Sequence, residues 1–165
     1  MKKTEIAKAN NSCKSANYRA VVPRYIMDTA PKDAVILDFG AGPKACHTKM
    51  MLEDGWDVTA YDFGENITET HDIDALSKTY DIVFASNVLN VQSSEEMLEE
   101  TIKQMWDAVK KGGILVVNYA GSPRYISWST KEMDEWLKKR FDNVERIRYN
   151  NYNLIWKIER LSYDS

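Results

Sequence analysis

The chain has 165 residues, of which 44% are hydrophobic, 28% charged and 11% aromatic, and its formal net charge is −3 at pH 7. This length and composition predict one globular domain and exclude a disordered acidic tail, a collagen-like chain and a membrane-spanning protein. No stretch approaches 18 consecutive apolar residues, and residues 1–14 lack the apolar core of a signal peptide. We therefore expect a cytoplasmic protein without a membrane partner.

Charge is unevenly distributed along the chain. Residues 1–30 carry six basic and two acidic side chains, residues 31–120 carry seven and sixteen, and residues 121–165 carry nine and seven. A basic N-terminal segment on an acidic domain fits an anionic partner at that segment, and it also fits a solvated amphipathic helix. Both interpretations stay open.

Apolar runs and amphipathic patterns alternate along the chain, which is typical of a parallel sheet with helices on its faces. Residues 5–29 are predicted to be helical, with Pro23 forcing a break or a fresh start. Another helix is predicted after the glycine-rich stretch that begins at Gly40, and it should end near Gly55. The predicted strands of this part cover residues 34–39, 57–62, 80–86 and 114–117.

The second half of the chain carries helix-start signals and ends in a hairpin pattern. Ser93 with Glu96 predicts the start of a helix whose last turn holds Lys110 and Lys111 and which ends at the glycine pair 112–113. Ser129 with Glu132 predicts the start of the next helix. Residues 144–149 and 154–161 flank an Asn-rich stretch and predict an antiparallel hairpin.

Residue types that often carry metals or nucleophilic catalysis are few. Cys13 and Cys46 form no CxxC pair, so we expect both to be reduced and we predict no metal site. His47 lies inside a predicted helix and His71 in a loop, and neither has triad spacing to a Cys or Ser. We expect surface or packing roles for both histidines.

The turn after the first predicted strand carries the clearest ligand signal. Gly40-Ala41-Gly42 follows the strand directly, and glycine lets the backbone approach a ligand where a Cβ would collide with it. Asp62 ends the next strand, 24 residues after Asp38, where a carboxylate can accept both hydroxyls of a ribose. Because the carboxyl ends of parallel strands border one crevice, this pattern predicts a nucleoside-containing ligand.

Four motifs in this order resemble the class I S-adenosylmethionine-dependent methyltransferases. They cover residues 35–42, 58–62, 80–89 and 109–117. The resemblance implies a single methyltransferase domain over residues 1–165 with an α/β, Rossmann-like sheet. The implied strand order is 3-2-1-4-5-7-6, mostly parallel with an antiparallel C-terminal hairpin.

The sequence departs from the family pattern after the second strand. Only nine residues separate Asp62 from Asp72, where the family places a helix and a strand. A helix of ordinary length, roughly 11–12 residues, does not fit in that gap. We therefore expect the third strand and its helix to be truncated, and the residue at the adenine edge can be Asp72 or Asp74.

Carried over position by position, the resemblance implies S-adenosylmethionine as cofactor and S-adenosylhomocysteine as product, with no metal. The implied cofactor-binding residues are Asp38, Gly40, Ala41 and Gly42 at the methionine end, Asp62 at the ribose, Phe63 against adenine, Asp72 and Ile73 at the adenine edge, and Ser86 and Asn87 beneath the sulfonium.

The sequence narrows the choice of methyl acceptor only by excluding some acceptor classes. Residues 86–89 lack the [DNS]-P-P-[YFW] string of amino-group DNA methyltransferases, and neither cysteine lies where C5 enzymes need one, so both kinds of DNA methylation are disfavoured. A small molecule, a nucleotide, an RNA end or a protein side chain stays open as the acceptor, including an anionic one. The candidate acceptor-side residues are Tyr18, Arg19, Asn118, Tyr119, Arg124 and Tyr125.

The short chain also shapes the expected acceptor site. Residues 1–30 are expected to form a basic helical segment that caps the acceptor side, and residues 121–129 are too few for a lid domain. The pocket is therefore expected to be open unless an oligomer partner closes it.

Three function classes follow from these observations. The first is an S-adenosylmethionine-dependent methyltransferase of the EC 2.1.1 class with unknown catalytic residues. The second is an S-adenosylmethionine-binding protein without transfer activity, which the shortened region 63–79 and the missing general base leave open. A nicotinamide-dependent oxidoreductase is disfavoured by the C-terminal hairpin and by the glycine-turn string.

Overall fold

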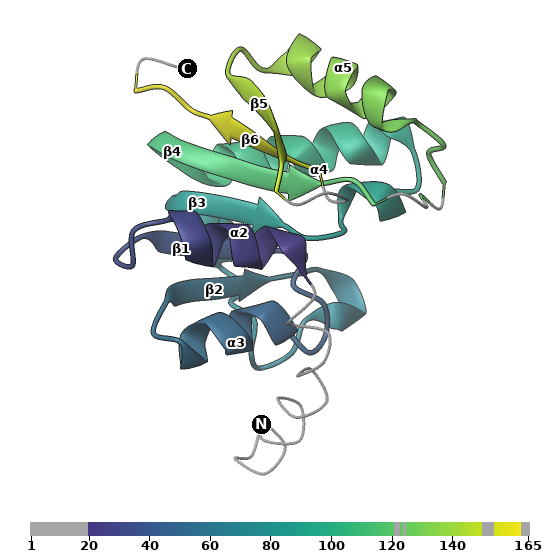
Figure 1. The fold of residues 1–165 in the computed structure, drawn as a ribbon. Helices are drawn as coiled ribbons and strands as arrows, with labels where there is room; N and C mark the ends of the chain where they lie inside the picture. The colour runs from purple at the N-terminus through teal and green to yellow at the C-terminus, as the bar shows by residue number, and fades with distance from the viewer. Residues whose placement is uncertain (1–19, 121–122, 124, 150–153, 163–165) are drawn as a thin grey trace.

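A six-stranded sheet with helices on both faces forms the centre of the protein in the computed structural model (Figure 1), which describes residues 20–120, 123, 125–149 and 154–162. The helices are α2 (Val21–Thr29), α3 (Cys46–Glu53), α4 (Glu95–Ala108) and α5 (Thr130–Arg140). The strands are β1 (Val35–Phe39), β2 (Asp57–Tyr61), β3 (Tyr80–Ala85), β4 (Val109–Asn118), β5 (Val144–Arg148) and β6 (Leu154–Glu159). Short 3-10 turns cover Gly64–Asn66, Ala75–Ser77 and Leu89–Val91.

The strand order confirms the predicted topology. The sheet runs β2-β1-β3-β4-β6-β5, in which β2, β1, β3 and β4 are parallel and β6 is antiparallel to both β4 and β5. This is the expected family order with its third strand removed. That strand is reduced to a single parallel bridge between Ala60 and His71, so the predicted truncation is also present.

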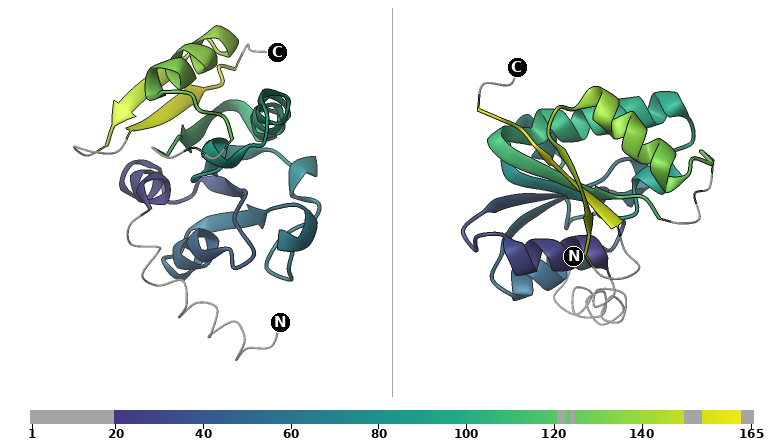
Figure 2. Two further views of the ribbon diagram at one scale, coloured as in Figure 1. Left: turned by 90° about the vertical axis from the view of Figure 1, so that its right-hand side faces the viewer. Right: turned by 45° about the horizontal axis from the view of Figure 1, so that its top comes forward.

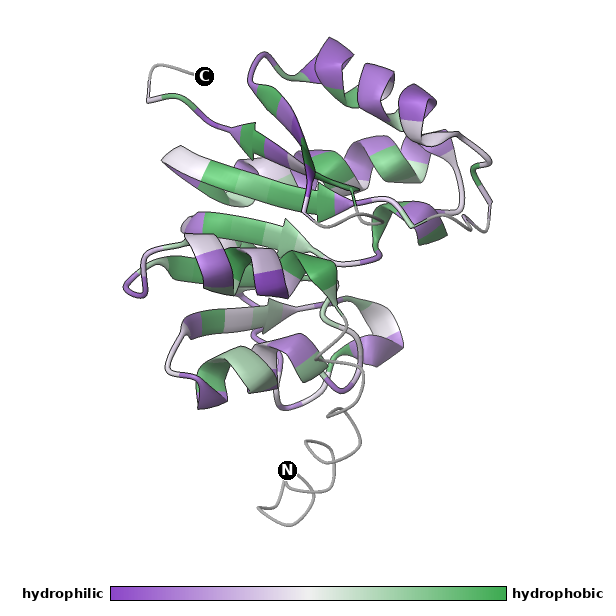
Figure 3. Ribbon diagram, viewed as in Figure 1, coloured by the Kyte–Doolittle hydropathy of each residue, from purple (hydrophilic) through white to green (hydrophobic). Residues whose placement is uncertain are grey.

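Two apolar layers hold the sheet between its helices. Helices α2 and α3 cover one face, and α4 and α5 cover the other, as Figure 2 shows from two further directions. The central strands are apolar along most of their length, and Figure 3 shows them as the greenest elements of the ribbon. Strands covered on both faces need such continuous apolar runs, which explains why β1 and β3 were predictable.

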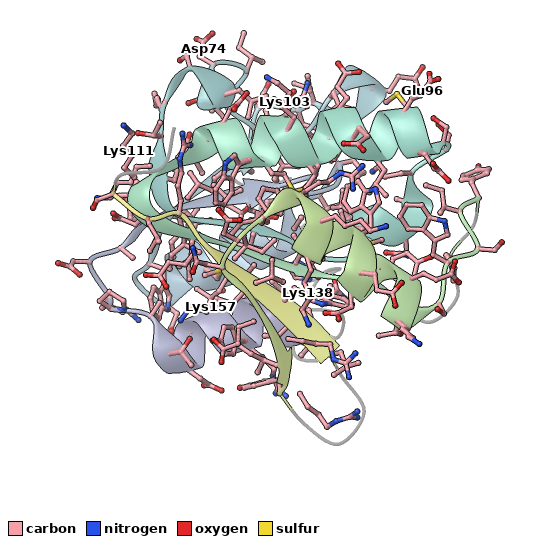
Figure 4. All side chains as sticks on the ribbon, turned by 90° about the horizontal axis from the view of Figure 1, so that it is seen from above. Asp74, Glu96, Lys103, Lys111, Lys138 and Lys157 are labelled. Carbon is pink, nitrogen blue, oxygen red and sulfur yellow. The ribbon has the colours of Figure 1, made fainter. Side chains whose placement is uncertain are left out.

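The outer surfaces of the helices are charged. Glu96 and Lys103 on α4, and Lys138 on α5, lie on the outer side of these helices in Figure 4. The inner side of α4 instead buries Leu98, Ile102 and Met105. This separation gives α4 an apolar stripe that packs on β3 and β4.

The junction between α4 and β4 differs from the sequence prediction. Ser94, not Ser93, caps α4, because its hydroxyl accepts a hydrogen bond from the Met97 N–H at 3.1 Å. The helix ends at Ala108, and residues 109–113 are the start of β4 rather than a helix end. The pairing of β3 with β4 shifts its register beside this glycine pair. A Cβ on Gly113 would lie 2.7 Å from the Asp81 carbonyl oxygen, so the close approach of the two strands requires glycine there.

Three other local predictions have different outcomes. The capping box at Ser129 is confirmed, because both of its reciprocal hydrogen bonds with Glu132 are present. Helix α2 begins at Val21, after the extended Ala20, so Pro23 lies in its first turn, where no N–H is needed, in agreement with the predicted fresh start. The expected helix before residue 20 lies outside the described residues.

Cys46 begins α3 and is disulfide-bonded. The expectation of a reduced thiol is therefore wrong for Cys46, and Cys13 lies outside the described residues. Spacing along the sequence misled here because disulfide formation depends on the spatial distance between two Cβ atoms.

Candidate functional site

Most residues predicted to bind the cofactor lie at or just after the carboxyl ends of the parallel strands β1, β2 and β3. The turn Gly40–Gly42, which we call the glycine turn, follows β1 and is joined to the end of β2. The N–H groups of Gly40 and Ala41 both donate to the Tyr61 carbonyl, at 2.9 and 3.0 Å. The sheet thus fixes the position of this turn.

The two glycines of the turn are required for different reasons. Both have a positive φ, +73° for Gly40 and +82° for Gly42, which side-chain-bearing residues adopt at a cost. A Cβ on Gly40 would also lie 2.7 Å from a methyl group of Val88, whereas no atom would come within 4 Å of a Cβ on Gly42. Gly40 therefore allows close packing, and Gly42 leaves open space above the turn.

Asp62 fastens the glycine turn from the β2 side. Its buried carboxylate accepts hydrogen bonds from the Gly42 N–H at 2.7 Å, from the Phe63 N–H at 2.8 Å and from the Asn66 amide at 3.4 Å. A carboxylate has about four acceptor positions. One position is left for a further donor.

Asp38 is a buried carboxyl next to this turn, with 1% of its surface exposed. Burial raises its pKa to about 7, and the negative charge of Asp62 adds to the rise. The Thr48 hydroxyl donates to Asp38 at 2.7 Å and opposes the shift by favouring the ionised form. A cation placed beside Asp38 would favour that form further.

Asn87 and Asn118 join the ends of β3 and β4. The Asn87 N–H donates to the Asn118 side-chain oxygen at 2.7 Å, and the Asn118 amide donates back to the Asn87 side-chain oxygen at 2.8 Å. Asn87 has a φ of 59°, a conformation that Asn tolerates better than most residues. Asn87, which was predicted to bind the cofactor, and Asn118, which was predicted to bind the acceptor, are thus in direct contact.

Ser86 precedes this pair at the end of β3. Its hydroxyl oxygen is buried and has no hydrogen-bond partner among the described residues. Buried hydroxyls are seldom left unpaired in proteins, so this atom is suited to a donor or acceptor that a ligand would bring.

The residues predicted to contact adenine follow β2. The Phe63 ring lies 6.4 Å from the Phe39 ring and 6.1 Å from the Tyr61 ring, between centroids, and stays 44% exposed. Ile73 is more open, at 71% exposed. Both present apolar surface at the edge of the sheet where the third strand is missing.

The carboxylate of Asp72 is already engaged. It accepts the Asp74 N–H at 2.9 Å and pairs with the Lys78 ammonium at 3.0 Å, and these contacts hold its pKa below the usual value. The Asp72 N–H in turn donates to the Ala60 carbonyl at 3.0 Å. Asp72 thus belongs to a local turn beside β2, and the choice between Asp72 and Asp74 at the adenine edge stays a prediction.

The predicted acceptor-side residues have different environments. Tyr119 is buried, and its hydroxyl donates to the Ile126 carbonyl at 2.8 Å, which closes the segment after β4. Tyr125 is 64% exposed in the same segment. Tyr18, Arg19 and Arg124 lie outside the described residues.

His71 contacts the glycine turn, which the sequence pattern did not predict. The His71 Nε2 lies 2.8 Å from the Gly42 carbonyl oxygen, although the two residues are 29 positions apart. The only signal in the sequence was the shortened segment after Asp62, which brings residue 71 back to the edge of β2.

The described part of the chain has neither a metal-binding cluster nor a membrane-spanning helix. It has no group of three or more His, Cys, Asp or Glu side chains placed to hold a metal ion. Within that part, no helix combines the length and apolar character needed to cross a bilayer. A cavity of about 520 Å³ lies between α2 and the amino ends of β1, β3 and β4, and one of about 740 Å³ lies between α4 and α5. Both are away from the glycine turn.

A sheet of this order, with a glycine turn after its first strand and an acidic residue after its second, defines a class I S-adenosylmethionine-dependent methyltransferase by fold. Residues 15–157 match the model of a family described as the methyltransferase domain, and the chain belongs to this family. The expected class and its cofactor, S-adenosylmethionine, are thereby confirmed. A comparison with curated proteins finds no match.

Several solved structures share the fold at low sequence identity. A TehB-like S-adenosylmethionine-dependent methyltransferase from Corynebacterium glutamicum is 17% identical, with a TM-score of 0.63 and coverage of 94% of this chain and 98% of that one. DesVI from Streptomyces venezuelae is 10% identical, with a TM-score of 0.64 and coverage of 96% and 99%. The 1,6-didemethyltoxoflavin-N1-methyltransferase of Burkholderia thailandensis, solved with that compound and S-adenosylhomocysteine, is 14% identical, with a TM-score of 0.58 and coverage of 96% and 86%.

Proposed function

We propose that the protein transfers a methyl group from S-adenosylmethionine to a small-molecule acceptor. The observation that carries the proposal is the glycine turn, which is fastened to β2 through Tyr61 and Asp62 and has open space at Gly42. Bound S-adenosylmethionine supplies an electrophilic methyl group on a sulfonium. Family membership and the fold support this assignment, and the identity of the acceptor is part of the proposal.

The residues around the turn suit the two ends of the cofactor. Asp38, Gly40, Ala41 and Gly42 would line the methionine end, where the cationic amino group favours an ionised Asp38. Asp62 would take a ribose hydroxyl at its remaining acceptor position. The unpartnered Ser86 hydroxyl and the neighbouring Asn87 would lie beneath the sulfonium.

The adenine would rest on apolar side chains beyond β2. The exposed rings and chains of Phe63 and Ile73 offer such a surface. We assign the hydrogen-bonding edge of adenine to the turn at Asp72, with Asp74 as the alternative.

The acceptor would lie beside the ends of β3 and β4. Asn118 faces Asn87 there, and Tyr119 and Tyr125 follow it. Tyr18, Arg19 and Arg124, and most of the predicted cap of residues 1–30, lie outside the described residues and stay predictions for this site. Several fold relatives act on small molecules, as the toxoflavin-precursor enzyme does, and this supports a small-molecule acceptor over a nucleotide or RNA end.

Catalysis in this proposal rests on positioning. Methyl transfer is an in-line displacement, so holding the acceptor atom and the methyl group in attack geometry supplies much of the rate. A general base is needed only for an acceptor that is protonated at neutral pH.

We further propose that the protein acts in the cytoplasm.

Asp62 provides the test of the cofactor site. We expect Asp62→Ala to weaken binding of S-adenosylhomocysteine at least tenfold, about 1.4 kcal/mol, by isothermal titration calorimetry. Asp57→Ala is the matched control, because Asp57 is an exposed carboxylate at the opposite end of the same strand. Equal affinity of Asp62→Ala and the wild type would contradict the ribose contact, and binding of NAD alone would overturn the proposed cofactor.

Transfer itself needs a second measurement. The wild-type protein, incubated with methyl-labelled S-adenosylmethionine and fractionated cell extract, should label a low-molecular-weight product. Label in RNA fractions would redirect the acceptor assignment. Tight S-adenosylhomocysteine binding without any labelled product would favour the non-catalytic binding protein.

A further inference from the structure

We propose that His71 is a positioning residue for the cofactor site, because it holds the carbonyl of Gly42 and thereby fixes the glycine turn. The inference rests on the proposed function, since it assigns to His71 an effect on cofactor affinity. It goes beyond that function because His71 is not among the predicted cofactor-binding residues and contacts the Gly42 carbonyl from the remnant of the third strand.

The hydrogen bonds of His71 determine which ring nitrogen carries the proton. The Thr68 N–H donates to Nδ1 at 3.0 Å, so Nδ1 must offer a lone pair. A neutral imidazole then has its proton on Nε2, which donates to the Gly42 carbonyl at 2.8 Å. The two contacts are therefore mutually consistent with one tautomer.

The Gly42 residue is held on both of its backbone groups. Its N–H donates to Asp62 at 2.7 Å, and its carbonyl accepts from His71. Glycine loses more conformational freedom on folding than any other residue. External hydrogen bonds on both sides restrict that freedom at Gly42, where a Cβ would meet no atom within 4 Å.

His71 is itself well anchored. Its ring and backbone are 9% exposed, its N–H donates to the Thr68 carbonyl at 3.1 Å, and it forms the bridge to Ala60 of β2. The next residue, Asp72, donates its N–H to the Ala60 carbonyl. The shortened third strand thus places the His71 side chain between the edge strand β2 and the glycine turn.

Two substitutions separate the contact to Gly42 from the contact to Thr68. In His71→Asn the side-chain oxygen can accept the Thr68 N–H near the position of Nδ1, but the side chain is too short to reach Gly42. In His71→Gln the amide can donate to the Gly42 carbonyl near the position of Nε2, while the Nδ1 acceptor is lost. A hydrogen bond contributes about 0.5–1.5 kcal/mol, so we expect S-adenosylhomocysteine to bind about fivefold more weakly to His71→Asn and within about twofold of wild type to His71→Gln.

Stability measured in parallel distinguishes positioning from a general structural role. Urea unfolding of both variants would show whether affinity simply follows stability. Wild-type affinity in His71→Asn, or equal weakening in both variants, would overturn the proposal. Absence of binding to the wild-type protein would instead refute the proposed function.

A measurement on the unmodified protein keeps the proposal testable if a variant does not fold. A long-range ¹H–¹⁵N NMR spectrum reports the tautomer of each histidine. We expect the Nε2–H form for His71 at a pH where its ring is neutral. Detection of the Nδ1–H form would remove the donor to Gly42 and overturn the proposal.

Discussion

The buried carboxyl of Asp38 makes the stability of the folded protein depend on pH. The folded protein raises the pKa of Asp38 from 3.8 to about 7, mainly because burial disfavours the charge. Between these two values the folded state holds a proton that the unfolded state has lost. The free energy of unfolding therefore falls as pH rises through this window, and the loss is complete above the folded pKa.

The size of the effect follows from the shift. Each pKa unit corresponds to 1.36 kcal/mol. Stability falls over the two pH units from pH 5 to the folded pKa of about 7 and then levels off. Through Asp38, the wild type therefore loses about 3 kcal/mol of unfolding free energy between pH 5 and pH 8. Asp38→Asn keeps an oxygen that can accept the Thr48 hydroxyl but does not titrate. The unfolding free energy of the variant relative to that of the wild type should therefore rise by about 3 kcal/mol between pH 5 and pH 8.

Urea unfolding of both proteins at pH 5, 6, 7 and 8 measures this difference, and the contributions of all other titrating groups cancel in it. Thr48→Val is the matched control with the opposite sign. The Thr48 hydroxyl favours ionised Asp38, so its removal should destabilise the protein more at pH 8 than at pH 5. A stability difference between Asp38→Asn and wild type that stays constant across this range would refute the reasoning.

Much of the sheet was predictable because its strands have distinct environments. The apolar runs of β1 and β3 are covered on both faces, and such runs have few alternatives. The truncation after β2 followed from a gap too short for a helix. The start of β4 was missed because the pair Lys110-Lys111 before Gly112-Gly113 is also typical of a helix end, and only the packing of Gly113 on the Asp81 carbonyl decides between them.

The candidate site was predictable in its positions but not in its contacts. Asp38 and Asp62 follow from strand ends, which the sequence pattern locates. The contact of Asn87 with Asn118 spans 31 positions and that of His71 with Gly42 spans 29. Contacts of this kind depend on strand order and register, and one sequence carries no local pattern for them.

Two glycine substitutions test the close approaches that the fold requires. Gly40→Ala combines a positive φ with a contact of 2.7 Å between its new Cβ and Val88, whereas the new Cβ of Gly42→Ala meets no neighbour. We therefore expect urea unfolding to show a larger loss of stability for Gly40→Ala than for Gly42→Ala. Adding Val88→Ala to Gly40→Ala should restore part of the difference. Gly113→Ala would press its Cβ against the Asp81 carbonyl oxygen at 2.7 Å, next to two further carbonyls. Backbone cannot rotate away as a side chain can, so we expect a loss of about 2 kcal/mol, within the range for overpacking. Gly112→Ala has open space but a φ of +88° and should lose about 1 kcal/mol. Equal losses at the two positions would mean that β3 and β4 separate easily there, and that the glycine pair has no packing role in the sheet.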